Sequence, residues 1–240
     1  MVECNLKCVT LNCRGLRDKG KRLSVFQYLK DENVDVACLQ ETYVTDNFIC
    51  MFNKDWPGQI FHAYSDSTHS RGVAILLKKT LNSTLIDTHR SEDGRRIMIN
   101  LNINDEEFCF ISAYAPDKNR IEFLKKLSSW ISKYACNTDR VIIGADLNTV
   151  DNVDDRSSKN LDYSSSQFTK FKQTLNLIDV WRDLNNGEIE YTYLHPSVLS
   201  SSRIDYILCS TRLASFVKSS FVNVAPVPDH KAVHVKKFNE

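Results

Sequence analysis

Polar side chains recur at the ends of short apolar runs, where a folded sheet would present them along one edge. They are Asn12, Glu41, Tyr114, Asp146, Asn148, Asp205, Asp229 and His230. Carboxylate oxygens are the hard ligands that Mg²⁺ prefers, and amide or phenol groups can donate hydrogen bonds to phosphate oxygens. An imidazole beside a carboxylate favours its charged form near neutral pH. No single residue is specific, but the ordered set predicts a reactive polar pocket.

Short runs rich in β-branched residues must position these side chains. The runs predicted as strands are residues 7–12, 34–40, 72–77, 96–103, 107–114, 140–146, 204–209 and 217–224. Residues 34–39 and 141–143 are apolar almost throughout, as expected of strands that are covered on both faces. The chemically interesting residues therefore follow or precede strands of a buried sheet.

Helical spacing of apolar residues appears in three other segments, at residues 21–30, 120–135 and 167–175. Residues 151–166 are polar and rich in turn formers, which predicts a long loop. Residues 185–202 are expected to form a hairpin or surface loop in which residues 192–194 pair as a strand. Many strands with a few helices predict a two-sheet core flanked by helices, and residues 1–240 are read as one domain.

The bulk composition is ordinary for a soluble globular protein, with 42% hydrophobic and 25% charged residues and a net charge of +1. This balance does not by itself indicate a polyanionic partner. The chain has 8 cysteines, none spaced as a zinc site, which favours reduced thiols and an intracellular location. No apolar run is long enough to cross a membrane.

Four sequence blocks together carry a family resemblance. They are Leu-Gln-Glu-Thr at 39–42, Gly-Ala-Asp-Leu-Asn at 144–148, Arg-Ile-Asp-Tyr-Ile at 203–207 and Asp-His at 229–230. In this order the chain resembles the endonuclease/exonuclease/phosphatase superfamily from about Leu6 to Val235. The resemblance implies an α/β fold, a four-layered sandwich of two packed mixed β-sheets between helices.

The resemblance also implies a Mg²⁺-dependent phosphodiesterase, in which Mn²⁺ can substitute for Mg²⁺. Hydrolysis of a phosphodiester adds negative charge to the phosphoryl oxygens, so the site must supply positive charge and hydrogen-bond donors. Glu41 is the first expected ligand of the ion, supported by Asn12 and Asp229. Mg²⁺ usually keeps several waters, so few carboxylates suffice to hold it.

By the same resemblance, His230 lies against the scissile phosphate and is hydrogen-bonded by Asp205. His230 is then either a general base or a cationic clamp, and Asp146 is the other candidate for activating water. Asn148, Asn12 and Tyr114 are expected to donate to phosphate oxygens.

Two positions depart from the common family pattern. Pro228 stands where many relatives have Ser before the final Asp-His, which removes a hydroxyl and a backbone donor. Asp117 stands where many have Asn, and an ionised Asp repels phosphate unless a metal or an Arg lies nearby. Activity is expected to survive both changes, with an altered rate or substrate preference.

Within the superfamily, residues 10–16, 113–116 and 202–207 resemble endonucleases of non-LTR (LINE-type) retrotransposons. Such an enzyme nicks double-stranded DNA and leaves a 3′-OH primer for target-primed reverse transcription, which implies a fused reverse transcriptase and work in the nucleus. An abasic-site repair endonuclease is the alternative, although Ser200, Ser201 and Ser202 occupy the place of the bulky Trp that such enzymes commonly carry. A catalytically silent nucleic-acid-binding module is a further alternative.

Contacts to the DNA are expected from basic and polar residues near these motifs. They are Arg14, Arg156, Thr192 and Arg203. Backbone contacts from Arg would give an affinity that falls with salt, while entry of the 185–202 loop into a groove would give sequence preference.

Overall fold

Neighbouring residues of the central strands face opposite sides of their sheets, as the two-residue period of a strand requires. In β1 (Lys7–Asn12), Cys8 packs between two sheets, whereas Val9 faces helices. In β8 (Val141–Asp146), Ile142 and Ile143 divide in the same way. Because both faces of each strand are covered, these runs are apolar almost throughout.

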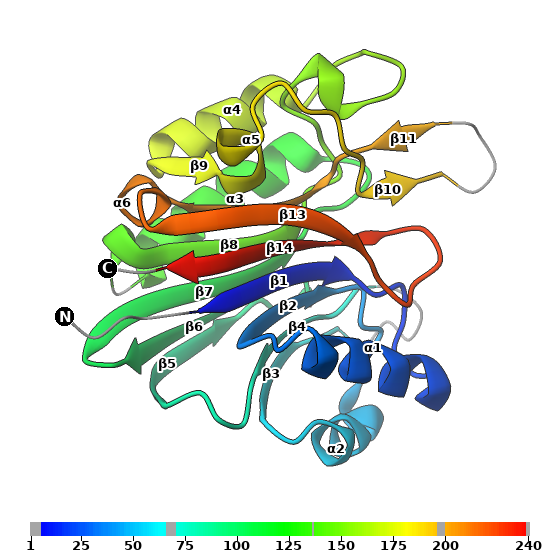
Figure 1. Cartoon of the computed structure of the whole chain (residues 1–240), viewed down its shortest axis with the longest axis vertical. Coiled ribbons are helices and arrows are strands. Elements are labelled where there is room, and N and C mark those ends of the chain that lie inside the picture. The colour runs from blue at the N-terminus through cyan, green and yellow to red at the C-terminus, as the bar shows by residue number, and fades with distance from the viewer. Residues whose placement is uncertain (1–5, 66–70, 136, 196–199, 239–240) are drawn as a thin grey trace.

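The computed structural model describes residues 6–65, 71–135, 137–195 and 200–238, and two six-stranded sheets make its centre (Figure 1). The first sheet has the order β13 (Val217–Val224), β14 (Lys231–Phe238), β1, β2 (Val36–Gln40), β4 (Val73–Leu77), β3 (Gln59–Ala63). The second has the order β5 (Ser83–Arg90), β6 (Arg96–Ile103), β7 (Glu106–Tyr114), β8, β12 (Asp205–Ser210), β9 (Leu177–Asp179). Only the β1–β2 and β7–β8 pairs are parallel among these described strands, so both sheets are mixed.

Helices cover the outer face of each sheet. Helices α1 (Lys19–Asp31) and α2 (Asp46–Asp55) pack on the first sheet, where Phe26 and Phe52 join its buried residues. Helices α3 (Arg120–Tyr134) and α4 (Ser165–Thr174) pack on the second sheet. The order helix, sheet, sheet, helix confirms the four-layered α/β sandwich.

The two sheets approach one another closely at Gly144. A Cβ at this position would lie 2.5 Å from Cys38 Cβ, so the close contact requires a glycine. Beside it, Gln40 Nε2 donates to Ser112 Oγ at 3.1 Å and to the Gly144 carbonyl at 3.1 Å. These buried hydrogen bonds lock the ends of β2, β7 and β8 together directly below the predicted pocket.

Short elements complete the edge of the sandwich. Helices α5 (Val180–Leu184) and α6 (Thr211–Ala214) flank β9, and strands β10 (Tyr193–Leu194) and β11 (Ser201–Ser202) form a separate hairpin. This hairpin projects from the end of the sandwich where β1 ends, opposite the two chain termini (Figure 1). The predicted pairing of residues 192–194 is confirmed at Tyr193 and Leu194, and residues 196–199 lie outside the described part of the chain.

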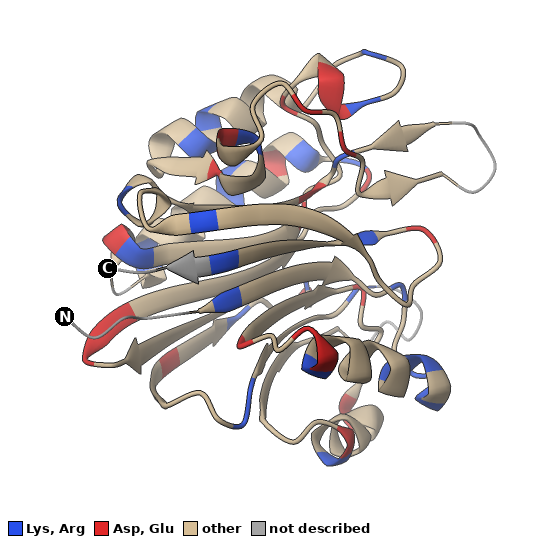
Figure 2. Ribbon diagram, viewed as in Figure 1, with Lys and Arg blue, Asp and Glu red and all other residues tan. Residues whose placement is uncertain are grey.

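Charged residues of both signs are interspersed along the ribbon in Figure 2, and basic residues gather at the start of α1. That start, which contains Lys19, Lys21 and Arg22, follows directly after the end of β1. Asp18 caps the helix by accepting a hydrogen bond from the Lys21 amide at 2.8 Å. Arg22 is buried and paired with Asp55, so Lys19 and Lys21 are the cations that the start of α1 offers near the predicted pocket.

Most predicted elements have the expected positions, and some elements were missed. Strands β1, β6 and β13 have the predicted bounds. Strands β3 and β5, helix α2 and strand β9 were not predicted. Among the described residues, no helix is long and apolar enough to cross a membrane.

Candidate active site

Strand direction brings the predicted site residues to one end of the first sheet. Because β1 and β2 are parallel, Asn12 and Gln40 are register partners, and Glu41 follows immediately. Strand β14 runs antiparallel to β1, so its beginning, preceded by His230, lies at that same end. Residues separated by about 200 positions in the chain are thereby neighbours at one sheet edge.

The second sheet contributes its acids at the same end. Tyr114 at the end of β7 pairs with Asp146 at the end of the parallel strand β8. Asp205, the first residue of β12, pairs with Asp146 from the other side because β12 is antiparallel to β8. The three side chains therefore stand in a row across adjacent strands.

Asn12 connects the two rows across the sandwich. Its Nδ2 donates to Glu41 Oε1 at 3.0 Å and to Asp146 Oδ2 at 2.8 Å. Its Oδ1 accepts the Arg14 backbone N–H at 3.0 Å. In this arrangement Asn12 is a donor between two carboxylates, and one of the two lone pairs of its oxygen accepts the Arg14 N–H. The expected support of the metal ion by Asn12 stays a prediction.

His230 and Asp205 form a buried pair. His230 Nδ1 lies 3.0 Å from Asp205 Oδ2 and 3.2 Å from Asp205 Oδ1. Tyr193 belongs to the β10–β11 hairpin, and its ring packs on the His230 imidazole with the two ring centroids 4.9 Å apart. A carboxylate at Nδ1 fixes the ring orientation and turns Nε2 away from Asp205.

Among the residues that the structure describes, Asp146, Asp205 and His230 form a group that could hold a metal ion, with one potential ligand atom from each lying within 4.8 Å of the others. Asp146 Oδ1 accepts the Asn148 backbone N–H at 3.0 Å, and Asn148 Nδ2 donates to the Ala115 carbonyl at 2.9 Å. Asn148 adopts a left-handed conformation with φ of 51° to make this turn. One N–H of its amide is therefore committed to the protein backbone.

The electrostatic environment differs sharply between these carboxylates. Burial, together with the negative charge of Asp205, raises the pKa of Asp146 well above its ordinary value. Burial also raises the pKa of Glu41, but hydrogen bonds from Asn12 and Tyr43 outweigh it and leave the Glu41 pKa lowered. Glu41 is thus held ionised, whereas Asp146 is poised to take up a proton.

The imidazole is held in its charged form. Burial lowers the pKa of His230, but the neighbouring Asp205 carboxylate outweighs burial and raises that pKa to about 9. At neutral pH the site therefore contains an imidazolium between carboxylates. Burial and the charge of Glu41 raise the pKa of the Tyr114 phenol, so it remains a hydrogen-bond donor.

A family model, described as the Endonuclease/Exonuclease/phosphatase family, matches residues 9–227. The chain belongs to this family. The Transposon TX1 uncharacterized 149 kDa protein of Xenopus laevis is 29% identical over 236 residues, which covers 96% of this chain and 18% of that protein. The chain thus spans less than one fifth of that relative's length.

Solved structures of similar fold have lower sequence identity. An AP endonuclease from Archaeoglobus fulgidus has a TM-score of 0.80 and 20% identity, covering 96% of this chain and 98% of that chain. The endonuclease domain of TRAS1, a telomere-specific non-LTR retrotransposon, has a TM-score of 0.73 and 16% identity, covering 97% and 98%. These likenesses confirm the fold that the sequence resemblance implied.

Two residues expected to contact DNA are instead buried parts of the family fold. Arg203 is 1% exposed, and its guanidinium binds Asp155 and Asp179. Thr192 is fully buried, and its Oγ1 accepts the backbone N–H groups of Ile204 and Asp205, each at 3.1 Å. These placements correct both expectations, because neither side chain faces solvent. Thr192 instead positions Asp205.

The other two expected contacts remain at the surface. The Arg14 guanidinium forms an ion pair with Asp229, and its side chain is 47% exposed. Arg156 Nη2 binds Asp162 Oδ2 at 3.1 Å, which ties the loop after β8 to the start of α4. Asp229 Oδ1 is buried without a hydrogen-bond partner among the described residues, so the expected ligand keeps one oxygen unused.

Sequence reasoning missed two residues of this end of the sandwich. The Tyr43 hydroxyl donates to Glu41 Oε2. Arg95 lies over the Tyr114 ring, 5.0 Å from its centroid, and Arg95 Nη1 donates to the Tyr114 carbonyl at 3.2 Å. Arg95 is also close enough to the exposed Asp117 for their charges to interact. The position of Tyr43, two residues after Glu41, could have indicated its place in the site. No sequence pattern indicates that Arg95 lies beside Tyr114.

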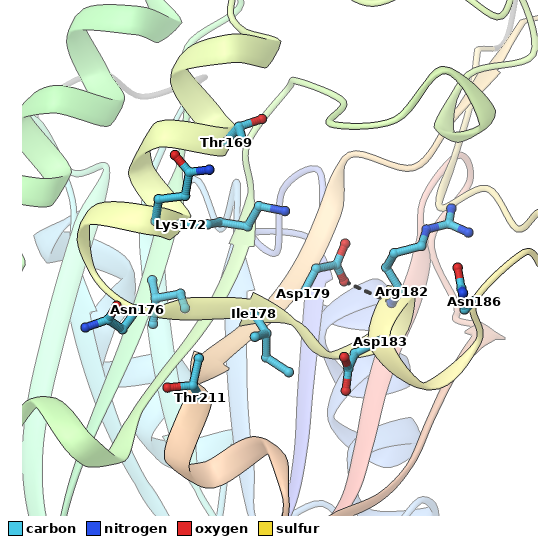
Figure 3. A pocket seen from close by; sticks show the side chains of 11 residues that line it. Thr169, Lys172, Asn176, Ile178, Asp179, Arg182, Asp183, Asn186 and Thr211 are labelled. Carbon is cyan, nitrogen blue, oxygen red and sulfur yellow. Dashed lines mark hydrogen bonds between the residues drawn. The ribbon is translucent and has the colours of Figure 1, made fainter.

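A separate hollow of about 570 Å³ lies between α4, β9 and α5, on the helix-covered side of the second sheet (Figure 3). Leu177 and Ile178 are among its lining residues. Its two cations are already paired, Lys172 with Asp151 and Arg182 with Asp155. The hollow therefore offers no excess positive charge to a nucleic acid, and it contains none of the predicted catalytic residues.

Proposed function

We propose that this chain hydrolyses DNA phosphodiesters with a divalent metal ion and nicks double-stranded DNA. The observation that carries the proposal is the Asn12 amide between Glu41 and Asp146, beside the Asp205–His230 pair. This juxtaposition combines an ionised carboxylate, a proton acceptor and an imidazolium in one place. Such groups can accept the proton of an attacking water and stabilise the charge that develops on a phosphodiester during hydrolysis.

The residues present fit a hard divalent cation. Glu41 is held ionised, and Asp229 Oδ1 is a buried oxygen without a partner among the described residues. Mg²⁺ prefers oxygen ligands, so Glu41 and Asp229 suit it better than the alternative group of Asp146, Asp205 and His230, which includes a nitrogen. When bound, Mg²⁺ supplies positive charge against the charge developing on the phosphoryl oxygens, and Mn²⁺ can take its place.

Side chains of this protein bind the phosphate and accept the proton of the attacking water. His230, charged at neutral pH, presents its Nε2 side to a phosphate oxygen as a cationic clamp, because its Nδ1 faces Asp205. Asp146, whose pKa is raised, accepts the proton of the attacking water. The second N–H of the Asn148 amide donates to the phosphate, and the Tyr114 phenol does so in exchange for its hydrogen bond to Glu41.

We further propose that residues 1–240 are one domain of a longer LINE-type retrotransposon protein that also carries a reverse transcriptase and acts on chromosomal DNA in the nucleus. The coverage of only 18% of the Xenopus transposon protein supports this proposal. Arg14 and the β10–β11 hairpin, which projects beside the site, are the proposed contacts to the duplex. The nick would leave a 3′-OH primer for reverse transcription.

The test is conversion of supercoiled plasmid to open circle with Mg²⁺, with EDTA, and with the His230→Ala variant. Nicking in Mg²⁺ alone, reduced by roughly 10²–10⁴-fold in His230→Ala, is expected. His89→Ala is the matched control, because His89 stacks on Tyr134 of α3 and is not part of the site. Equal rates for parent and His230→Ala, or nicking that persists in EDTA, would refute the mechanism.

A duplex oligonucleotide with one abasic site separates the proposal from the alternative of a repair enzyme. The proposal predicts no large preference for the abasic duplex, because Ser201 and Ser202 stand where a bulky ring would line a pocket. Cleavage confined to the abasic strand would assign the repair function instead. Metal-free binding without any cleavage would assign a silent binding module.

A further inference from the structure

We propose that Tyr43 is a positioning residue that orients the Glu41 carboxylate for a divalent cation, an inference that rests on the proposed function. The Tyr43 hydroxyl donates to Glu41 Oε2, while Asn12 Nδ2 donates to Glu41 Oε1 at 3.0 Å. The Tyr114 phenol also hydrogen-bonds to this carboxylate. Donors on both oxygens fix the plane of the carboxylate and still leave it lone pairs for a cation.

The backbone around Tyr43 is held in an uncommon conformation. Glu41 and Tyr43 both have positive φ, at 48° and 56°, a region that residues other than glycine seldom adopt. Neighbouring hydrogen bonds maintain it: the Tyr43 amide donates to the Arg71 carbonyl at 3.0 Å, and Arg17 Nε donates to the Tyr43 carbonyl at 2.6 Å. Such strain persists where the surroundings determine it, and it is typical of functional sites.

The Tyr43 ring is fixed as firmly as its backbone. A Cβ on Gly15 would lie 2.7 Å from Tyr43 Cδ2, so the ring lies directly against the glycine. Gly15 itself donates to the Glu41 carbonyl at 2.6 Å. Since ring and carboxylate are both anchored to the Gly15 segment, the phenol meets Glu41 at a set distance and angle. A purely space-filling ring would require neither the hydroxyl contact nor this alignment.

The expected consequence concerns metal affinity more than the maximal rate. Groups that hydrogen-bond a metal ligand typically change metal affinity by roughly 10–100-fold when they are removed. Mg²⁺ demands near-ideal geometry, so a carboxylate that is free to rotate binds it less well. Tyr43→Phe keeps the ring against Gly15 and removes only the donor. It should therefore raise the apparent Mg²⁺ dissociation constant by about 10–100-fold and leave the nicking rate at saturating Mg²⁺ near that of the parent.

The experiment measures Mg²⁺ binding to the 240-residue chain by calorimetry, and the nicking rate as a function of Mg²⁺ concentration. Tyr28→Phe is the matched control, because the Tyr28 hydroxyl pairs with His234 Nε2 at 2.7 Å on the outer face of the first sheet. Thermal unfolding in EDTA verifies that each variant is folded. Weaker binding and a higher Mg²⁺ midpoint in Tyr43→Phe, with neither in Tyr28→Phe, support the inference.

Two other results overturn it in distinguishable ways. Equal Mg²⁺ affinity in the parent and Tyr43→Phe, with nicking intact, refutes the role of Tyr43 and leaves the proposed function standing. Absence of Mg²⁺ binding and of nicking in the parent refutes the proposed function, and the inference with it. A loss of maximal rate at saturating Mg²⁺ without a change in affinity would also overturn the inference, because Tyr43 would then act on the reaction instead of the ion.

Discussion

Two buried groups of charges lie on either side of the start of β12, and they are built differently. Around Arg203, one guanidinium binds Asp155 through two parallel hydrogen bonds of 2.9 Å and also binds Asp179 at 2.6 Å. Arg182 binds Asp155 as well, so two arginines face two aspartates. Trp181 and Tyr206 enclose the Arg203 guanidinium, with ring centroids 5.0 and 4.7 Å away. This group is balanced in charge.

The candidate site contains Asp205, two residues after Arg203, and its charges are not balanced. Asp146, Asp205 and Asp229 are each less than 5% exposed, and Glu41 adds a fourth carboxylate, against the cations of His230 and Arg14. Buried charges without partners destabilise a fold, whereas paired ones can be retained. The comparison indicates that the Arg203 group serves the structure. The excess of carboxylates at the site is explained by a function that brings positive charge to it.

Asp146→Asn tests the unbalanced group most directly. The substitution removes a buried negative charge and the proton acceptor, so nicking should fall by about 10²–10⁴-fold. The free energy of unfolding in EDTA should not fall by more than about 1 kcal/mol, because the lost charge was unfavourable there. Plasmid nicking and urea unfolding measure the two effects.

Asp139→Asn, at an exposed ion pair with Arg212, is the matched control. A large loss of stability in Asp146→Asn would make this group structural too.

Arg203→Met tests the balanced group. It leaves Asp179 buried without its arginine and Asp155 paired with Arg182 alone, so the free energy of unfolding should fall by about 3–5 kcal/mol. Arg212→Met removes a surface ion pair whose side chains are 53% and 60% exposed, and it should cost less than about 1 kcal/mol. Urea unfolding measures both. A small effect of Arg203→Met would show that the paired group is as dispensable as a surface contact.

The pH dependence of stability should also separate the two groups. The folded pKa of His230, about 9, lies above its ordinary value of 6.5, so its contribution is complete below pH 6.5 and is lost as the pH rises through 9. In EDTA the parent should therefore lose on the order of 1–3 kcal/mol across this window, and His230→Gln should lose less. The Arg203 guanidinium stays charged across this window, because its neighbouring aspartates raise an Arg pKa that is already high. A parent whose stability is flat between pH 6.5 and 9 would contradict the charged imidazole.

The sequence predicted the unbalanced group better than the balanced one. Asn12, Glu41, Asp146 and His230 adjoin strands, and strand direction alone brings them together. The partners of Arg203 lie 48 and 24 residues earlier in the chain, in a 3-10 turn and at the end of a short edge strand. No periodicity in the sequence relates Asp155 and Asp179 to Arg203. The sequence therefore predicts Arg203 as a DNA contact, and its buried ion pairs are visible only in the structure.

The sequence does not predict helices and strands whose burial leaves no clear pattern of apolar residues. Strand β5 is an edge strand whose residues are exposed or half-buried, and a register shift between Leu85 and Asp87 interrupts its pairing. Helix α2 fully buries only Phe52, with Phe48 and Ile49 partly buried beside it, so its apolar stripe is short. Central strands such as β2 and β8 are buried along their whole length and were recognisable for that reason. Sequence patterns therefore predict burial, and through burial they predict the elements that hold the site.

A second buried imidazole, that of His62, gives the smallest expected effect and sharpens the comparison. His62 is 8% exposed, lies against the Phe52 ring, and neither of its ring nitrogens has a hydrogen-bond partner among the described residues. Burial lowers its pKa to about 4, so its contribution to stability is present above pH 6.5 and is lost as the pH falls through 4. His62→Phe should reduce the loss of unfolding free energy between pH 8 and pH 5 by on the order of 1–2 kcal/mol, measured by urea unfolding at both values. An unchanged difference would mean that His62 is charged in the fold. Burial without a carboxylate would then not suffice to keep an imidazole neutral, and the contrast with His230 would lose its physical basis.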